Sequence, residues 1–194
     1  MLIPPVGDQL PRRGNLFTSV VARLLMLLTG WRFEGALPNL PKFVLIVAPH
    51  TSNWDFPVGV MAIFGLGIRG TFLGKDSLFR PPFGFYFRWL GGVPVDRKSS
   101  NNVVDQTIGY FSTRDRIILA LSPEGTRRKI PQWRTGFYWV AVGAGVPIVP
   151  VAFDFPRRRI VLNPPQLMSG EMEKDLAQLR GFFNAAQAYR PGNY

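Results

Sequence analysis

The stretch "FVLIVAPHTSNWDFPVGVMAIF", residues 43–64, places an apolar run, a polar turn and a second apolar segment in direct succession. The run Phe43–Ala48 is typical of a strand that is buried on both faces, as in parallel sheets. A helix is expected over Phe56–Leu66, with Asp55 as its N-cap and Pro57 in its first turn. A strand that leads directly into a helix predicts the crossover unit of a parallel α/β sheet.

The same alternation continues along the chain. Further strands are expected at Gly92–Asp96, Arg116–Leu121 and Pro147–Phe153, the last joined through Pro156 to Arg159–Leu162 as an edge hairpin. Helices are expected at Leu78–Leu90, Asn101–Thr113, Thr135–Gly145 and Glu171–Ala188. We therefore predict an α/β fold with a mostly parallel sheet covered by helices, forming a single domain over residues 31–194.

Cysteine is absent and there is one histidine, His50, among 194 residues. The lack of cysteine excludes disulfides, thiolate nucleophiles and cysteine-ligated zinc. A single imidazole also excludes a histidine-rich metal site. We therefore predict no metal site.

The charge balance is strongly basic. Lys and Arg number 23 against 12 Asp and Glu, a net charge of +11, which favours anionic partners. A merely soluble basic surface would show the same balance. The chain also contains 16 Phe and 5 Trp, and basic residues mixed with aromatic ones suit a membrane interface better than a nucleic-acid groove. We predict anionic membrane lipids as partners and no nucleic acid.

An apolar segment, Leu16–Leu28, precedes the predicted domain. Its 13 residues would span about 20 Å as a helix, short of the roughly 30 Å hydrocarbon core. We expect residues 1–30 to form an amphipathic interfacial anchor, with Trp31 at headgroup level and Arg23 reaching toward water. Two alternatives are a secretory hydrophobic region, which no small-residue cleavage motif follows, and a core helix of the domain.

His50 stands where the first strand ends. Ligands of open α/β sheets bind beyond the carboxyl ends of the strands. The turn "HTSNWD" would bring the Asp55 carboxylate back to the imidazole, fix its tautomer and leave the second ring nitrogen as a general base. In the alternative interpretation, Asp55 only caps the helix and His50 is an ordinary loop residue.

A second polar stretch, "SPEGTRRK" at residues 122–129, follows the predicted strand Arg116–Leu121 and reaches the same edge. Its glycine, Gly125, permits close backbone approach, and Thr126 offers a hydroxyl. Arg127 offers a planar fork for phosphate oxygens. Glu124 could orient either Arg127 or the substrate. "GGVPVDR" at residues 91–97 ends a further strand there with Asp96 and Arg97.

Together these blocks resemble the glycerolipid acyltransferases of the lysophosphatidic-acid acyltransferase type. The resemblance runs from about Lys42 to Asp154 and departs from the family pattern at Pro49 and Ser122, which replace Asn and Phe. The matching blocks are His-x-Ser-x-x-Asp (His50, Ser52, Asp55), "GGVPVDR" with Lys75 upstream, Pro-Glu-Gly-Thr-Arg (Pro123–Arg127), and the strand Val146–Val151.

The resemblance implies an acyl transfer without a covalent acyl-enzyme and without a bound cofactor. His50, aided by Asp55, would deprotonate the hydroxyl of a lysophospholipid, which attacks the thioester of acyl-CoA or acyl-carrier protein. The expected acceptor is 1-acylglycerol-3-phosphate. Another lysolipid, such as an amino-acid-containing one, and a non-catalytic basic membrane-binding module remain alternatives.

The resemblance also assigns roles and a location. The expected substrate-binding residues are Ser52, Lys75, Arg97, Glu124, Gly125, Thr126 and Arg127. Val149 and Pro150 would shape an acyl channel, although buried strand residues would look the same. Candidate oxyanion donors are backbone N–H groups near Gly125 or in the helix after Asp55. We expect a peripheral or monotopic enzyme on the cytoplasmic face of a bacterial inner membrane, and predict no oligomeric state.

Overall fold

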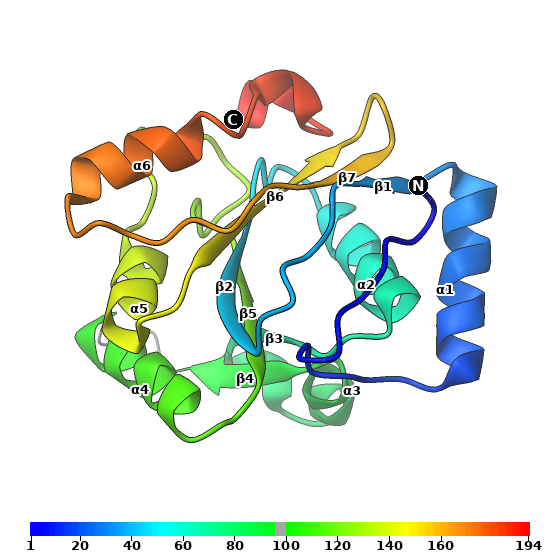
Figure 1. Ribbon diagram of the computed structural model, residues 1–194, viewed down its shortest axis with the longest axis horizontal. Coiled ribbons are helices and arrows are strands. Elements are labelled where there is room, and N and C mark those ends of the chain that lie inside the picture. Colours follow the sequence, from blue (N-terminus) through cyan, green and yellow to red (C-terminus); the bar gives the residue numbers. More distant parts are fainter. Residues whose placement is uncertain (96–99) are drawn as a thin grey trace.

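A seven-stranded sheet forms the centre of the molecule in the computed structural model, which describes residues 1–95 and 100–194 (Figure 1). The strands lie in the order β1-β7-β6-β2-β5-β3-β4, and all neighbours are parallel except β6 and β7. Their bounds are β1 Arg32–Glu34, β2 Lys42–Val47, β3 Gly70–Lys75, β4 Gly92–Val95, β5 Ile117–Leu121, β6 Ile148–Asp154 and β7 Arg159–Leu162. The expected α/β fold and the antiparallel pairing of β6 with β7 are confirmed, but this hairpin is not at the edge of the sheet, because β1 pairs with β7 on its outer side.

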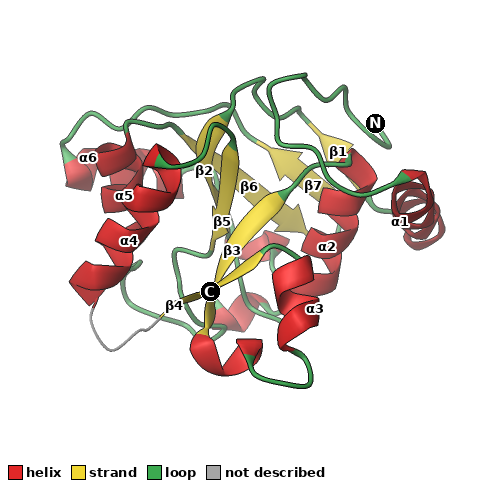
Figure 2. Ribbon diagram, turned by 90° about the horizontal axis from the view of Figure 1, so that it is seen from below, coloured by secondary structure: helices red, strands yellow, loops and turns green. Residues whose placement is uncertain are grey.

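Helices cover both faces of this sheet. The helices are α1 Leu16–Thr29, α2 Asp55–Leu66, α3 Gly84–Trp89, α4 Ser100–Ser112, α5 Gly136–Ala144 and α6 Met172–Arg180. Short 3₁₀ turns occur at Asp76–Phe79, Ala185–Gln187 and Pro191–Asn193. Figure 2 shows α4, α5 and α6 on one side of the sheet and α1, α2 and α3 on the other.

Two predicted helices differ from those in the structure, and two strands were not predicted. The helix expected over Leu78–Leu90 is broken between Phe79 and Gly84, because Pro81 and Pro82 cannot continue a helix. The last helix ends at Arg180 instead of Ala188. Strands β1 and β3 were not predicted: β1 has three residues, and β3 reads "GTFLGK", a short run whose glycines weaken the strand pattern.

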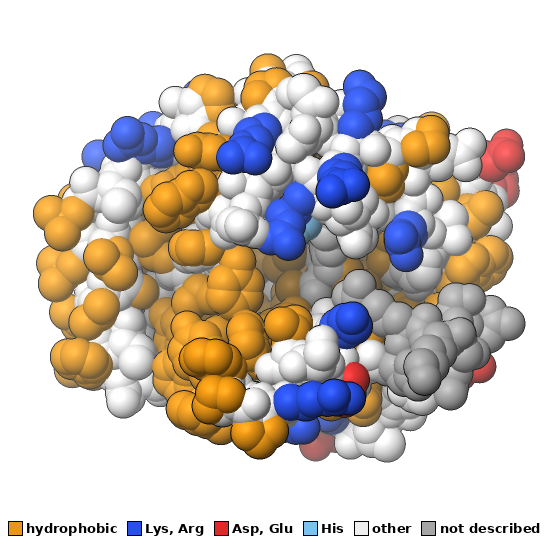
Figure 3. All heavy atoms as spheres, turned by 180° about the vertical axis from the view of Figure 1, so that it is seen from behind, with side chains coloured by type: hydrophobic (Ala, Val, Ile, Leu, Met, Phe, Trp, Pro, Cys, Tyr) orange, Lys and Arg blue, Asp and Glu red, His pale blue; other side chains and the backbone are white. Residues whose placement is uncertain are grey.

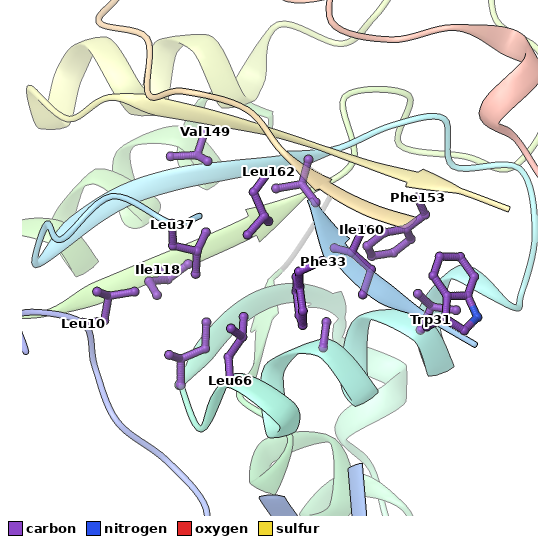
Figure 4. Close-up of a cluster of buried hydrophobic side chains, with 14 of the residues drawn as sticks. Leu10, Trp31, Phe33, Leu37, Leu66, Ile118, Val149, Phe153, Ile160 and Leu162 are labelled. Carbon is purple, nitrogen blue, oxygen red and sulfur yellow. The ribbon is translucent and has the colours of Figure 1, made fainter. Parts of the chain in front are cut away.

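The core lies on both faces of the sheet. Successive residues of β2 alternate sides, so that Phe43 packs toward α2 whereas Val44 packs toward α5, and neither is exposed. This explains why the strand reads as a continuous apolar run. Figure 4 shows the α2-side cluster, in which Phe33, Ile118 and Phe153 converge.

The N-terminal segment packs on the domain. Leu10 and Met26 are fully buried, and the Arg23 Nε–H donates to the carbonyl of Gly65 at 3.1 Å. Trp31 is only 7% exposed and contacts the ring of Phe155 edge-on at 5.1 Å. The expectation of Trp31 at headgroup level is therefore wrong, because its indole completes the core. Arg23 is exposed, as expected, although its Nε–H is bonded to the end of α2.

Helix α1 nevertheless keeps a wide apolar outer face. Ala22 and Met26 are its buried residues, whereas Leu16 and Leu28 are each 80% exposed and Phe17 is 74% exposed. Residues 100–194 and 1–95 together contain no helix that is long and apolar enough to cross a membrane. The helix thus combines a docked face, as the core-helix alternative expected, with an unpartnered apolar one.

Candidate active site

The loop between β2 and α2 holds His50 against Asp55. The imidazole Nδ1 lies 2.9 Å from Asp55 Oδ2, which also accepts the backbone N–H of Ser52 at 2.9 Å. Asp55 is the first residue of α2 and is 3% exposed. The N-cap residue is Trp54, without a side-chain capping bond, so Asp55 is not the N-cap. Its carboxylate is turned to the imidazole instead, and the predicted pair is present.

This pairing fixes the imidazole. A carboxylate beside Nδ1 keeps the proton of the neutral ring on that nitrogen and leaves the Nε2 lone pair available. The His50 side chain is 28% exposed, and Nε2 has no partner among residues 1–95 and 100–194. Figure 3 shows the imidazole inside a hollow, with Lys and Arg side chains around it and apolar side chains beside it. The accessible nitrogen can therefore accept a proton.

Glu124 holds the same loop from the neighbouring strand. Its Oε1 accepts the backbone N–H of His50 at 2.9 Å, and the residue is 2% exposed. Burial raises the pKa of Glu124, against the opposing effects of this hydrogen bond and the nearby imidazole. In the described part of the chain, Glu124 makes no ion pair with Arg127. It thus positions His50, and of the two alternatives for Glu124 the orientation of Arg127 is not observed.

Three buried oxygen atoms at this site have no hydrogen-bond partner among the described residues. They are Asp55 Oδ1, Ser122 Oγ and Glu124 Oε2. Buried polar atoms in native proteins are normally satisfied. Their gathering around one loop distinguishes this part of the molecule from the apolar core.

Gly125 forms a tight turn after β5. Its φ is +62°, and its N–H donates to the carbonyl of Ser122 at 3.1 Å. A Cβ at this position would come within 2.9 Å of the Arg134 side chain. The positive φ therefore favours glycine here, and a larger residue would also have to displace the Arg134 side chain. Because its N–H is already bonded, it is not a free oxyanion donor.

The remaining predicted polar residues fall into two groups. Ser52 is buried, and its Oγ accepts the N–H of Trp54 at 3.2 Å, so this side chain shapes the loop. Lys75, at the end of β3, and Arg127 are exposed, and Thr126 is partly exposed. Arg127 makes no hydrogen bond or ion pair within the described residues. Asp96 and Arg97 lie outside the residues that the structure describes.

The predicted acyl-channel residues lie inside the sheet. Val149 is 0% exposed and belongs to the cluster under α2, and Pro150 is buried beside it in β6. The carbonyl of Pro150 accepts the N–H of Asn163 in the adjoining segment. Both positions match the buried-strand interpretation, because both residues are buried and Val149 is packed in the cluster of Figure 4.

A cavity of about 330 Å³ opens beside Glu124 and was not predicted. Lys129, Trp133, Arg180 and Tyr194 contribute to its wall, and the Arg180 guanidinium lies 5.5 Å from the centre of the Trp133 ring. Burial and the charge of Glu124 raise the pKa of Tyr194. These residues lie far apart between Lys129 and Tyr194 and share no motif, so the sequence did not predict that they would form one cavity.

The C-terminal segment lies against the His50 loop. The N–H of Arg190 donates to Thr51 Oγ1 at 3.2 Å, and Phe155 N–H donates to the carbonyl of Gln187 at 2.9 Å. Ala188 between them is 3% exposed. The site is thus built from three sequence regions: the turn after β2, the turn after β5, and residues that follow α6.

Comparison with known proteins identifies the same region. The family model described as "Acyltransferase" matches residues 35–154, which include His50, Asp55 and Glu124. The 1-acyl-sn-glycerol-3-phosphate acyltransferase of Escherichia coli (strain K12) is 30% identical over 126 residues, covering 61% of this chain and 50% of that protein. The corresponding protein of Haemophilus influenzae is 29% identical over 146 residues, covering 70% of this chain and 59% of that protein.

The chain therefore spans about half the length of the curated relatives that it matches. A crystal structure titled as the 1-acyl-sn-glycerophosphate (LPA) acyltransferase PlsC from Thermotoga maritima has a TM-score of 0.58 and 20% identity. The match covers 86% of this chain and 75% of the Thermotoga maritima chain. It supports the same fold. The match of the family model over more than half of the sequence, at the loops that hold His50 and Glu124, shows that this chain belongs to the acyltransferase family.

Proposed function

We propose that the protein transfers a fatty acyl group from an acyl thioester to the hydroxyl of a lysophospholipid. The observation that carries the proposal is the 2.9 Å contact between His50 Nδ1 and the buried Asp55 carboxylate, with Nε2 unpartnered among the described residues. General-base catalysis needs such an accessible nitrogen within reach of the reacting hydroxyl. Both acyl-CoA and acyl-carrier protein supply the required thioester.

In the proposed reaction, Nε2 accepts the proton of the acceptor hydroxyl while its oxygen bonds to the thioester carbonyl carbon. The carbon–sulfur bond then breaks, and the imidazolium returns the proton to the leaving sulfur. The products are an ester and a free thiol. Asp55 stabilises the imidazolium that forms in between. The first turn of α2, where the helix dipole is positive, is the remaining candidate for stabilising the oxyanion.

We further propose 1-acylglycerol-3-phosphate as the acceptor, which the names of the curated relatives support. Arg127 is exposed and has no partner within the described residues, so its fork is available for phosphate oxygens. Lys129 and Arg180 line the cavity beside Glu124 and add positive charge there. The phosphate would thus bind on the side of His50 that faces the C-terminal segment.

The apolar surface suggests how the lipid substrates reach the site. Trp54, next to Asp55, is 58% exposed, and Phe56 is 41% exposed. Exposed aromatic residues continue on α3, where Phe85 is 76% exposed. We propose that this surface and the outer face of α1 lie in the headgroup region of the cytoplasmic leaflet, as a peripheral attachment. The acyl chain would then lie along this surface and not between Val149 and Pro150.

The test is turnover by the purified protein. It is mixed with 1-acylglycerol-3-phosphate and either palmitoyl-CoA or palmitoyl-acyl-carrier protein, and the diacyl product is measured by mass spectrometry while the released thiol is measured separately. Parallel reactions contain other lysophospholipids and an amino-acid-containing lysolipid. We expect product with at least one donor, and loss of about 100-fold to 10,000-fold of the rate in His50→Ala.

A folded wild-type protein that transfers no acyl group to any of these acceptors would indicate the non-catalytic membrane-binding alternative. Transfer to a different lysolipid would keep the reaction and change the acceptor. Equal turnover by wild type and a folded His50→Ala would remove His50 from the chemistry.

A further inference from the structure

A second basic site lies at the end of the sheet opposite His50, where β3 and β5 begin. Arg69 immediately precedes β3, while Arg114 and Arg116 precede β5, and Arg88 lies in α3. All four line one cavity of about 110 Å³. Because β2, β3 and β5 are parallel, the amino ends of β3 and β5 lie at the end of the sheet opposite the carboxyl end of β2, from which His50 follows. Figure 2 shows α3 beside β3 and β4 in this part of the molecule.

Three of these guanidinium groups are oriented by contacts that are not ion pairs. One Nη–H of Arg116 donates to the carbonyl of Asp8 at 2.7 Å. The Arg88 guanidinium carbon lies 5.3 Å from the centre of the Phe79 ring, and that of Arg114 lies 4.6 Å from the Tyr110 ring. A carbonyl or a ring uses only part of a guanidinium's five donors. The remaining donors are held in place and available.

No carboxylate of the described residues lines this cavity. Asp115 stands between two of the arginines in the sequence but does not contribute to the wall. Asp8 lies outside the wall as well; its hydrogen bond with Asn39 and, to a smaller extent, the charge of Arg116 lower its pKa. Within the described residues, none of the four arginines makes an ion pair. Like charges this close repel one another unless an anion binds between them.

A fifth arginine adds to the positive charge. The guanidinium of Arg13 stacks on Phe64 and Trp89, with its carbon 5.4 Å and 4.9 Å from the two ring centres. Burial and then the charge of Arg69 lower the pKa of Arg13. The arrangement therefore places a partly buried cation, Arg13, beside exposed ones at the cavity.

We propose that this cavity binds one phosphate group, at a site separate from the proposed catalytic one. Guanidinium forks match phosphate oxygens in paired, charge-assisted hydrogen bonds. A volume of about 110 Å³ is below the roughly 300–1,000 Å³ typical of sites that enclose a whole small-molecule ligand. The cavity thus suits the anionic group of a ligand whose remainder stays outside.

Two sources can supply such a group: the headgroup of a membrane phospholipid or a free phosphate. The helix that contains Arg88 also exposes Phe85 and Trp89, with 76% and 51% of their surface accessible. Exposed aromatic residues beside a phosphate site are typical of membrane interfaces. Both sources share the same recognition chemistry, and vesicles and inorganic phosphate distinguish them.

The test uses a double variant and a control of equal charge. Arg69→Gln with Arg114→Gln removes two cavity arginines. Arg32→Gln with Arg159→Gln removes two paired neighbours in β1 and β7, at the far edge of the sheet. Thermal melting is followed while inorganic phosphate replaces chloride at constant ionic strength. We expect the midpoint to rise with phosphate in the wild type and the control, and the half-saturating phosphate concentration to increase about tenfold or more in the cavity variant.

Binding to phosphatidylglycerol vesicles, with phosphatidylcholine vesicles as the uncharged reference, identifies the source. A weaker affinity of the cavity variant than of the control assigns the site to lipid headgroups, whereas equal affinities assign it to a free phosphate. Identical phosphate responses of the two double variants would overturn the proposal. Acyl-transfer rates in detergent should be equal in all three proteins, so a failure of the proposed catalytic function would be seen independently.

Discussion

His50 is held from two directions at once. Its ring is bonded to Asp55 on the following helix, and its backbone N–H to Glu124 on the loop after the adjacent strand. The imidazole is therefore oriented before any substrate binds, and orientation of this kind reduces the entropy that must be lost in the reaction.

The first prediction concerns the partner of the imidazole. In Asp55→Asn the amide has a donor that can face Nδ1, which favours the proton on Nε2 and removes the general base. We expect kcat to fall by about 100-fold to 10,000-fold while the Tm stays within a few degrees. Steady-state kinetics and thermal melting on the same preparation provide the measurement. A folded Asp55→Asn with unchanged kcat would contradict the proposed role.

The second prediction concerns the buried carboxyl group. The raised pKa of Glu124 means that the native state binds its proton more tightly than the unfolded state does. Stability is therefore lost as the pH rises from the ordinary carboxyl range through the raised pKa. Glu124→Gln keeps an oxygen that accepts the His50 N–H and removes the charge. We expect its Tm to exceed that of the wild type at pH 8, with the difference shrinking toward pH 4.

Glu173→Gln, at an exposed position in the first turn of α6, is the control for loss of one negative charge. Melting curves between pH 4 and pH 8 compare the three proteins. If Glu124→Gln and the control showed the same pH dependence, burial of the Glu124 charge would not explain the shift.

Among the elements, those with strong local signals were predicted most closely. The strand expected at Phe43–Ala48 is observed at Lys42–Val47, and the helix expected at Phe56–Leu66 begins one residue earlier. Strand β3 was missed because "GTFLGK" is recognisable only through its neighbours β4 and β5. Its pairing depends on contacts that are distant in sequence.

The same contrast applies to the candidate site. His50 and Asp55 are five positions apart, so the turn between strand and helix was enough to predict their contact. Arg180 and Tyr194 reach the neighbourhood of Glu124 only because the sheet and α6 bring the C-terminal segment back. That approach depends on the three-dimensional packing and has no counterpart in local spacing.

The third prediction concerns the attachment of α6 to α5. The buried hydroxyl of Tyr138 donates to Asp175 Oδ2 at 3.0 Å, and Ser169 donates to both oxygens of the same carboxylate. Burial alone would raise the pKa of Asp175, but these hydrogen bonds outweigh it and hold the pKa below its ordinary value. Tyr138→Phe removes one of them and should cost about 1–3 kcal/mol of unfolding free energy.

Such a loss corresponds to a Tm decrease of about 2–4 °C per kcal/mol in a protein of this size. Tyr86→Phe removes a hydroxyl from a 41% exposed ring and serves as the control, with no expected change. Because the depressed pKa of Asp175 contributes stability that is lost as the pH falls through it, the difference should narrow in acid. Equal melting of both variants at neutral pH would contradict this role of Tyr138.

At the scale of the whole molecule, basic and apolar side chains occupy different parts of the surface around His50. Basic residues surround the hollow that contains His50, while apolar side chains cover the adjoining surface (Figure 3).

The fourth prediction concerns the basic residues around this hollow. Arg127→Lys keeps the charge but loses the fork, so we expect a higher KM for 1-acylglycerol-3-phosphate with little change in kcat. An unchanged KM with a collapsed kcat would remove Arg127 from phosphate binding.

The fifth prediction addresses the apolar surface. Leu28 is 80% exposed on α1, and Leu167, in the connection between β7 and α6, is 76% exposed. Leu28→Gln should weaken binding to vesicles by about tenfold or more, since burying a leucine side chain contributes about 1.5–3 kcal/mol. Leu167→Gln should leave binding unchanged. Co-sedimentation with anionic vesicles measures both, and equal losses would indicate that α1 has no special part in attachment.

The bond between the His50 N–H and Glu124 has a consequence for the lengths of two connections. Strands β2 and β5 pair in register at Ile46 and Leu121, so four positions lead from this pair to His50 and three lead to Glu124. One inserted residue in either connection would add up to about 3.5 Å of chain, more than the length of the bond. The bond therefore restricts the length of both connections, and we expect insertions and deletions there to break it. The connection from Leu162 to Met172 is fixed by comparable bonds, from Asn163 to Pro150 and between Gln166 and Ile148, so its length is restricted in the same way.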